Sequence, residues 1–110
     1  MVSKVEDVQD LPIPIGIDLG NSVSRVGAFD IGTESSKLIL NEDGHSTTPT
    51  VLAFTETELV IGFDALEQAI ENPENTIDNF LRLIGRSLDE PHMAQFVKTL
   101  PYKTERNHNN

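Results

Sequence analysis

The segment GIDLGNSVSRVG, residues 16–27, has the pattern of two strands joined by a tight turn. Isoleucine or leucine occupies every second position from Ile13 to Leu19, the period of a strand whose two faces have different surroundings. Turn-forming residues follow, and a second apolar run extends from Val23 to Phe29. The sequence therefore predicts a strand, a turn and a returning strand, with Asp18 on the face opposite the isoleucines.

The turn between these strands consists of small and polar residues, Gly20, Asn21 and Ser22. Backbone N–H groups of such a turn can bind phosphate, and a carboxylate at the end of the preceding strand, here Asp18, can order a hydrated metal ion. The spacing matches neither the G-x-x-x-x-G-K-[ST] loop nor the G-x-G-x-x-G turn. By this pattern alone, a plain hairpin bend is the simpler interpretation.

Short apolar runs between turn residues predict three further strands, at 38–40, 50–54 and 59–61. Beyond Gly62 the apolar period changes to that of a helix. The first predicted helix has its apolar residues at positions 65, 66, 69 and 70. It ends at Asn72, because the residue before a proline is disfavoured in the α conformation.

Two more helices are predicted from the same spacing. The second runs from Asn75 as N-cap to Gly85 as stop, with the apolar stripe Ile77, Phe80, Leu81 and Ile84. The third follows Pro91, with its stripe at Met93, Phe96, Val97 and Leu100. The predicted fold class is therefore α/β in its α+β form, a meander of strands followed by short helices.

The length of 110 residues supports one modest core and no more than one domain. Residues 1–12 are charged and aperiodic, so we expect a flexible leader there. Residues 13–102 are expected to form the folded part. Residues 103–110, KTERNHNN, have no large apolar side chain and are expected to be a disordered tail.

The composition excludes several classes of function. Eight Lys and Arg against 18 Asp and Glu give a formal charge of -10, which repels nucleic acid phosphates and anionic lipid surfaces. There is no cysteine, hence no disulfide and no thiolate nucleophile or metal ligand. The polar N-terminus MVSKVEDVQD lacks the apolar core of a secretory signal. We therefore expect no nucleic acid partner, no membrane association and a cytoplasmic location.

Four segments together carry a resemblance to a known family. In order along the chain, IGIDLGNSVSRVGAF, LNEDGHSTTPTVLAFTETELVIG, ENPENT and RLIGR resemble the start of the ATPase domain of the 70-kDa heat-shock chaperones. The resemblance covers roughly residues 13–100. It implies part of an actin-like nucleotide-binding fold, in which two lobes close on ATP or ADP with Mg²⁺.

The resemblance assigns specific roles within the first hairpin. It implies that Asp18 lies near the metal and that Gly20, Asn21, Ser22 and Val23 form the first phosphate-binding turn. This chain departs from the family, which usually has two threonines and an aromatic residue where Asn21, Ser22 and Val23 stand. The Asn21 amide and the Ser22 hydroxyl can still donate hydrogen bonds to phosphate.

A second departure precedes the RLIGR segment. The family places a lysine immediately before that arginine, reaching toward the transferred phosphate, and here the position is Leu81. A leucine offers neither charge nor donor to an anionic transition state. Asn79 likewise stands where an aspartate is usual. No catalytic residue is therefore assigned, and Leu81 is expected to pack in the core through the helical stripe described above.

The resemblance ends before the family's second phosphate loop, its adenine pocket and its peptide-binding domain. We therefore expect a truncated chaperone-like protein that carries the first phosphate-binding turn, whose family role is ATP-dependent protein folding, and that does not hydrolyse ATP alone. The alternative is a non-catalytic interaction protein that binds a chaperone or another protein without nucleotide. In either case exposed strand edges are expected to favour a protein partner or self-association.

The remaining chemical groups have simpler interpretations. His45, His92 and His108 are scattered and form no i, i+4 pair, so we assign them no metal. Arg82 and Arg86 could face phosphate in a complete domain, or they could pair with local carboxylates.

Overall fold

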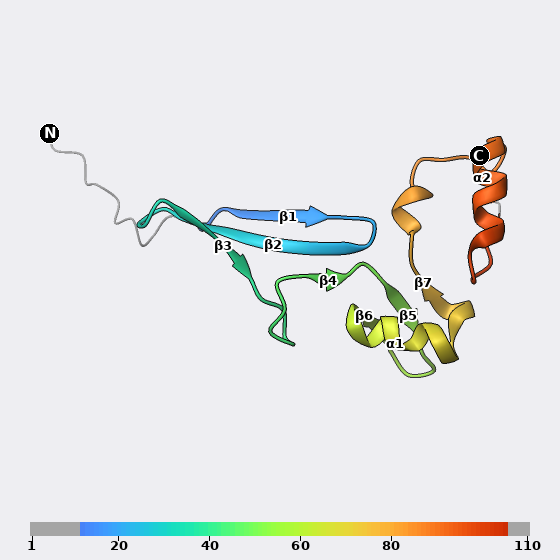
Figure 1. Ribbon diagram of the computed structural model, residues 1–110, viewed down its shortest axis with the longest axis horizontal. Coiled ribbons are helices and arrows are strands. Elements are labelled where there is room, and N and C mark those ends of the chain that lie inside the picture. The colour runs from blue at the N-terminus through green and yellow to red at the C-terminus, as the bar shows by residue number, and fades with distance from the viewer. Residues whose placement is uncertain (1–11, 106–110) are drawn as a thin grey trace, which may run out of the picture.

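The computed structural model describes residues 12–105 and places them in two small antiparallel sheets and two α-helices (Figure 1). This arrangement confirms the predicted α+β class with its early strand meander. The expected leader, apart from residue 12, and residues 106–110 of the expected tail, with His108, lie outside the described residues.

The first sheet contains the hairpin predicted from residues 16–27. Its strands are β1 (Ile15–Leu19), β2 (Val23–Asp30) and β3 (Ser35–Ile39), arranged in that order and antiparallel. The short strand β4 (Thr48–Pro49), which the sequence did not predict, pairs with the start of β2. Because β2 has neighbours on both sides, β1 forms an outer edge of this sheet.

The turn between β2 and β3 is held by the carboxylate of Asp30. Its Oδ1 accepts hydrogen bonds from the backbone N–H groups of Gly32 at 2.9 Å and Thr33 at 3.2 Å. Hydrogen bonding to Thr33 lowers the pKa of this carboxyl below its ordinary value. Asp30 therefore forms the local side-chain-to-backbone turn that aspartate favours.

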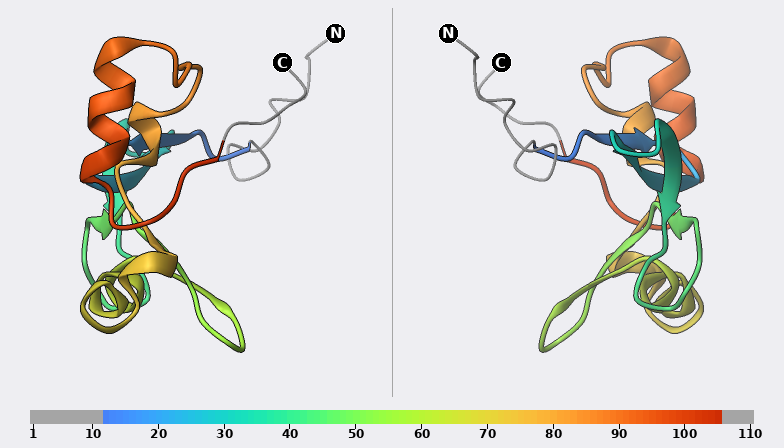
Figure 2. Two further views of the ribbon diagram at one scale, coloured as in Figure 1. Left: turned by 90° about the vertical axis from the view of Figure 1, so that its right-hand side faces the viewer. Right: turned by 90° about the vertical axis from the view of Figure 1, so that its left-hand side faces the viewer.

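The second sheet carries the small core. It has the order β6 (Leu59–Ile61), β5 (Leu52–Phe54) and β7 (Thr76–Ile77), and helix α1 (Phe63–Glu71) packs against it. The buried apolar cluster is Val51, Ala53 and Ala65, with Val60 packed against it. Figure 2 shows the β5–β6 hairpin projecting away from α1. The helix is where the sequence predicted it, but Ile70 in its apolar stripe is 87% exposed.

The predicted second helix is wrong. Residues 73–85 instead form a 3-10 helix (Pro73–Asn75), strand β7 and another 3-10 helix (Phe80–Arg82). Thr76 and Ile77 pair with β5, and Asn79 adopts a left-handed conformation with φ of 52°, which a continuous helix does not allow. Asn75 is thus the end of a 3-10 helix and caps no α-helix. Gly85 has a positive φ of 71°, as a stop residue would.

The third predicted helix is present as α2 (Pro91–Phe96), followed by a 3-10 turn (Val97–Thr99). Pro91 occupies its first turn, where a missing N–H group costs no hydrogen bond. The guanidinium of Arg82 lies 5.6 Å from the ring centroid of Phe96 and joins this helix to the preceding segment. Tyr102, beyond the turn, is buried.

The chain is elongated. The described structure measures 65 × 34 × 24 Å, and its radius of gyration of 20.0 Å exceeds the value of about 13 Å for a compact domain of this length. Figure 1 shows the first sheet extending away from the part that contains α1 and α2. Large apolar side chains on β1 consequently remain exposed, among them Ile15 (62%), Ile17 (73%) and Leu19 (58%).

Candidate functional site

The turn between β1 and β2 is tied to the segment that follows β4. The backbone N–H of Thr50 donates to the carbonyl oxygen of Ser22 at 2.9 Å. The hydroxyl groups of Ser24 and Thr50 also form a hydrogen bond, at 2.8 Å. Since Thr50 is buried, these contacts fix the base of the turn against the more compact part of the molecule.

Glycine is required at position 20 by a close approach of the backbone to itself. A Cβ atom on Gly20 would lie 2.5 Å from the carbonyl oxygen of Val23. By contrast, a Cβ atom on Gly16, in the same hairpin, would meet nothing within 4 Å. The turn is therefore tighter than an ordinary side chain allows, and Gly20 has a specific structural role.

The tip of the turn presents backbone donors. Among residues 12–105, the N–H groups of Asn21 and Ser22 have no hydrogen-bond acceptor. Successive backbone N–H groups in a turn form a concave site for anions. The Ser22 side chain is exposed beside them and adds a hydroxyl donor. These groups suit the oxygens of a phosphate.

The side chain of Asn21 connects this turn to a distant segment. Its Nδ2 donates to Oδ1 of Asn79 at 2.8 Å across 58 residues of sequence. Within the described part of the chain, Asn21 Oδ1 and Asp78 Oδ1 are buried and have no hydrogen-bond partner. A buried acceptor without a donor costs about 1–3 kcal/mol, so the surrounding structure holds these side chains in place at a cost.

Asp18, the residue predicted to lie near a metal, has a cationic neighbour. It lies directly opposite Arg25 in the β1–β2 pairing, and one guanidinium nitrogen is 3.4 Å from its Oδ2. The two side chains are 65% and 44% exposed. No group of three or more His, Asp or Glu side chains suited to a metal occurs in residues 12–105. A single exposed carboxylate fits contact with the water shell of Mg²⁺, a cation that retains several waters.

Leu81 lies close in sequence to the residue that Asn21 contacts. It belongs to the 3-10 helix Phe80–Arg82, which begins directly after Asn79, and its side chain is half-buried. Leu81 is outside the buried cluster around Ala53, so the expectation of a core position was only partly correct. The structure thus places the segment containing Leu81 beside the turn, although the helix predicted to carry it is absent.

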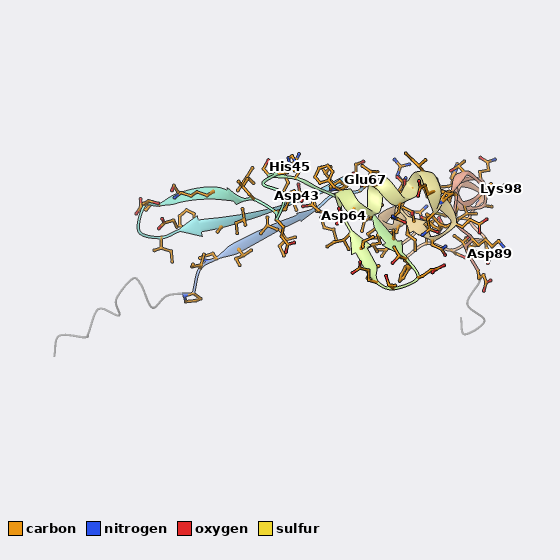
Figure 3. All side chains as sticks on the ribbon, turned by 90° about the horizontal axis from the view of Figure 1, so that it is seen from below. Asp43, His45, Asp64, Glu67, Asp89 and Lys98 are labelled. Carbon is orange, nitrogen blue, oxygen red and sulfur yellow. The ribbon has the colours of Figure 1, made fainter. Side chains whose placement is uncertain are left out.

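The other candidate groups have local roles. Arg86 pairs with Glu90 at 2.5 Å, which is the local pairing considered from the sequence, and Arg82 lies over Phe96. The ring of His45 packs against the ring of Phe63, with centroids 4.9 Å apart. Figure 3 shows His45 and Asp89 in different parts of the molecule. These residues do not converge on the turn.

Two features of this site could not be read from the sequence. The Asn21–Asn79 contact depends on the non-local placement of the segment after β7, and no spacing rule connects two residues 58 positions apart. The Asp18–Arg25 pair follows from the hairpin register and could have been found by counting across a turn of three residues.

The site and fold define a class: a strand–turn–strand unit with a glycine-dependent anion-binding turn, in an antiparallel α+β setting. Comparison with known families gives a match of residues 14–110 to the model of the Hsp70 protein family. The chain belongs to this family. It is 37% identical over 99 residues to heat shock 70 kDa protein 13 of Bos taurus and 38% identical over 99 residues to that of Mus musculus.

The aligned region covers 86% of this chain and 21% of each relative, so the chain spans about a fifth of their length. As to membranes, the helices within residues 12–105 are all too short or too polar to cross a bilayer.

Proposed function

We propose that this chain supplies the first phosphate-binding turn of an Hsp70-type nucleotide site, which takes ATP or ADP with Mg²⁺. The observation that carries the proposal is the tight turn at Gly20, whose neighbours Asn21 and Ser22 present backbone N–H groups without an acceptor in the described structure. Membership of the Hsp70 family supports the choice of a nucleotide among phosphate ligands.

Each residue of the turn has a distinct role in this proposal. Gly20 permits the close approach of the backbone, the N–H groups of Asn21 to Val23 face the phosphate, and the Ser22 hydroxyl adds a donor. Asp18 would hold water molecules of the magnesium shell. When bound, Mg²⁺ supplies positive charge that neutralises the phosphates. Arg25 lies beside Asp18 and offers a second cation for the same anionic ligand.

Phosphate binding without hydrolysis is the second part of the proposal. A phosphoryl-transfer transition state needs cations and donors where negative charge develops. Leu81, in the segment tied to the turn through Asn79, supplies neither. We propose that this chain retains the ligand-binding part of the family activity, ATP-dependent chaperoning of protein folding, and does not turn over ATP itself.

Calorimetric titration of the 110-residue chain tests the proposal with three probes: Mg·ATP, Mg·triphosphate and adenosine. If the turn binds phosphates, ATP and triphosphate bind and adenosine gives no heat of binding. Binding of adenosine as tightly as ATP, or no binding of either phosphate compound at millimolar concentration, would contradict it. Substitution of Ser22 by Ala should weaken triphosphate binding, whereas the matched change Ser36→Ala, in β3, should not.

A second candidate function is that of a non-catalytic interaction protein, and the exposed apolar residues of β1 favour it. Ile15, Ile17 and Leu19 lie on one face of an edge strand, where an added strand could pair. The net charge of -10 opposes contact between copies, but salt screens this repulsion beyond about 10 Å. On this proposal the chain self-associates or binds a partner more strongly as salt is raised.

Light scattering after size-exclusion chromatography distinguishes this candidate. Association that rises with salt, binding of the dye ANS, and loss of both effects in Ile17→Thr would support it. A sharp monomer peak at low and high salt without dye binding would exclude it. Association that is independent of nucleotide favours the interaction role over the nucleotide role.

A further inference from the structure

Two polar contacts connect the phosphate turn to the C-terminal part of the described chain. The first is the hydrogen bond from Asn21 Nδ2 to Asn79 Oδ1, at 2.8 Å. The second is a hydrogen bond from the hydroxyl of Tyr102 to the carbonyl oxygen of Asp78, the residue next to Asn79. The turn, the segment before the 3-10 helix Phe80–Arg82, and Tyr102 are therefore joined in sequence.

The segment in the middle is held in one conformation. Asn79 has a φ of 52°, a left-handed conformation that asparagine tolerates better than most residues because its short polar side chain bonds locally. On one side, Thr76 pairs with Ala53 in the second sheet. On the other side, Arg82 lies over the ring of Phe96 in α2. The amide that Asn21 contacts thus has a fixed position.

The anchor at Tyr102 is buried and remains a donor at neutral pH. Tyr102 is 7% exposed, and this burial raises the pKa of its phenol above 10.0, with the nearby carboxylate of Asp78 adding to the shift. Its proton is therefore available to the Asp78 carbonyl throughout the physiological range.

We propose that Asn21 is a positioning residue: its amide bond to Asn79 fixes the tip of the phosphate turn, and Tyr102 extends this link to the α2 region. That the turn binds phosphate rests on the proposed function, but the link itself does not. Because coupling between two sites is reciprocal, a ligand on the turn would also stabilise the position of Asp78 and Tyr102.

Native-state hydrogen exchange of the 110-residue chain without nucleotide tests the link. The reporter is the N–H of Thr50, which donates to the Ser22 carbonyl of the turn. The control is the N–H of Gly62, which donates to Val51 in the other sheet. Loosening the turn should accelerate exchange at Thr50 and leave Gly62 unchanged, whereas a global loss of stability accelerates both.

Two substitutions of Asn79 form a matched pair. Asn79→Gly removes the acceptor and accepts the left-handed conformation without strain. Asn79→Asp keeps an acceptor oxygen for Asn21. We expect Asn79→Gly to accelerate Thr50 exchange by about fivefold, the effect of one lost hydrogen bond, and Asn79→Asp to restore the parent rate. Equal rates at Thr50 in Asn79→Gly and the parent, or equal acceleration at Thr50 and Gly62, would overturn the proposal.

A second pair tests the distant end. Tyr102→Phe and Thr99→Val each remove a hydroxyl that donates to a backbone carbonyl, in the latter case that of Phe96 at 2.7 Å. We expect Tyr102→Phe to shift the NMR signals of the Asn21 side-chain amide and to speed exchange at Thr50, and Thr99→Val to do neither. An unchanged Asn21 amide signal in Tyr102→Phe would show that the link stops at Asn79.

The affinity for Mg·triphosphate then separates the link from the proposed function. If both hold, Asn79→Gly binds this probe several times more weakly than Asn79→Asp. If the parent does not bind the probe while the exchange results stand, the proposed function fails and the structural link survives.

Discussion

The carboxylate of Asp18 and the guanidinium of Arg25 face each other across the β1–β2 hairpin, with 3.4 Å between the charged atoms. Both side chains are largely exposed, and exposed ion pairs contribute about 0–1 kcal/mol to stability. The pair is therefore a poor structural element but a well-placed ligand-binding one, since it lies at the end of β1 next to the turn.

Substitution of Asp18 by Asn should separate these two roles. We expect the free energy of unfolding in urea to change by less than about 1 kcal/mol, because the pair is exposed. The Mg²⁺-dependent part of triphosphate binding should be lost, because the amide carries no charge to hold the metal's water shell. Titrations with and without Mg²⁺ measure this. An unchanged dependence on Mg²⁺ would remove Asp18 from the site.

Two glycines of the hairpin should respond differently to the same change. Gly20→Ala should destabilise the chain by about 1–3 kcal/mol, because its new methyl group would lie 2.5 Å from the Val23 carbonyl oxygen. Gly16→Ala meets nothing within 4 Å and should cost less than about 0.5 kcal/mol. Urea unfolding of both variants checks this, and equal stabilities would show that the turn has no close approach at position 20.

Leu81 is expected to tolerate a lysine. A fully buried leucine would lose about 2 kcal/mol on such a change, but Leu81 is half-buried in a 3-10 helix, so we expect about 1 kcal/mol. The parent chain should show no ATP turnover, because no cation stands at this position. Steady phosphate release by the parent above a protein-free control, abolished by Asp18→Ala, would contradict the assignment.

The success of the sequence analysis depended on how local the determining interactions are. The alternation through Ile15 and Leu19 and the turn at Gly20 define the first hairpin, and both lie within a dozen residues. Helix α1 was also predicted from its spacing and from Pro73. Its apolar stripe, however, did not indicate burial, since Ile70 is almost fully exposed.

The segment 75–85 shows where local patterns fail. Ile77, Phe80 and Ile84 have helical spacing, but Ile77 pairs with Leu52 in β5 and the left-handed Asn79 separates it from Phe80. Pairing with a strand more than 20 residues away outweighed the helical pattern, as tertiary contacts often do. For the same reason, the contact between Asn21 and Asn79 became apparent only in three dimensions.

Alkaline pH should weaken the fold through Tyr102. Its folded pKa is raised, chiefly by burial, so between the unfolded pKa of about 10 and the higher folded pKa the unfolded chain has lost a proton that the folded chain retains. The stability due to the neutral phenol is fully present below about pH 10 and falls as pH rises through the folded pKa. Urea unfolding across this range should show the fall, and Tyr102→Phe should lack this component. An identical pH dependence in both chains would show that Tyr102 does not titrate on unfolding.

The most direct test of the phosphate-turn assignment is an NMR titration of the ¹⁵N-labelled 110-residue chain with Mg·ATP. The account predicts that the largest shifts occur at the backbone N–H signals of Gly20, Asn21, Ser22 and Val23, while the signal of Gly44, in a different turn, stays in place. Saturable shifts confined to other residues, or no shift at the turn at millimolar Mg·ATP, would contradict it.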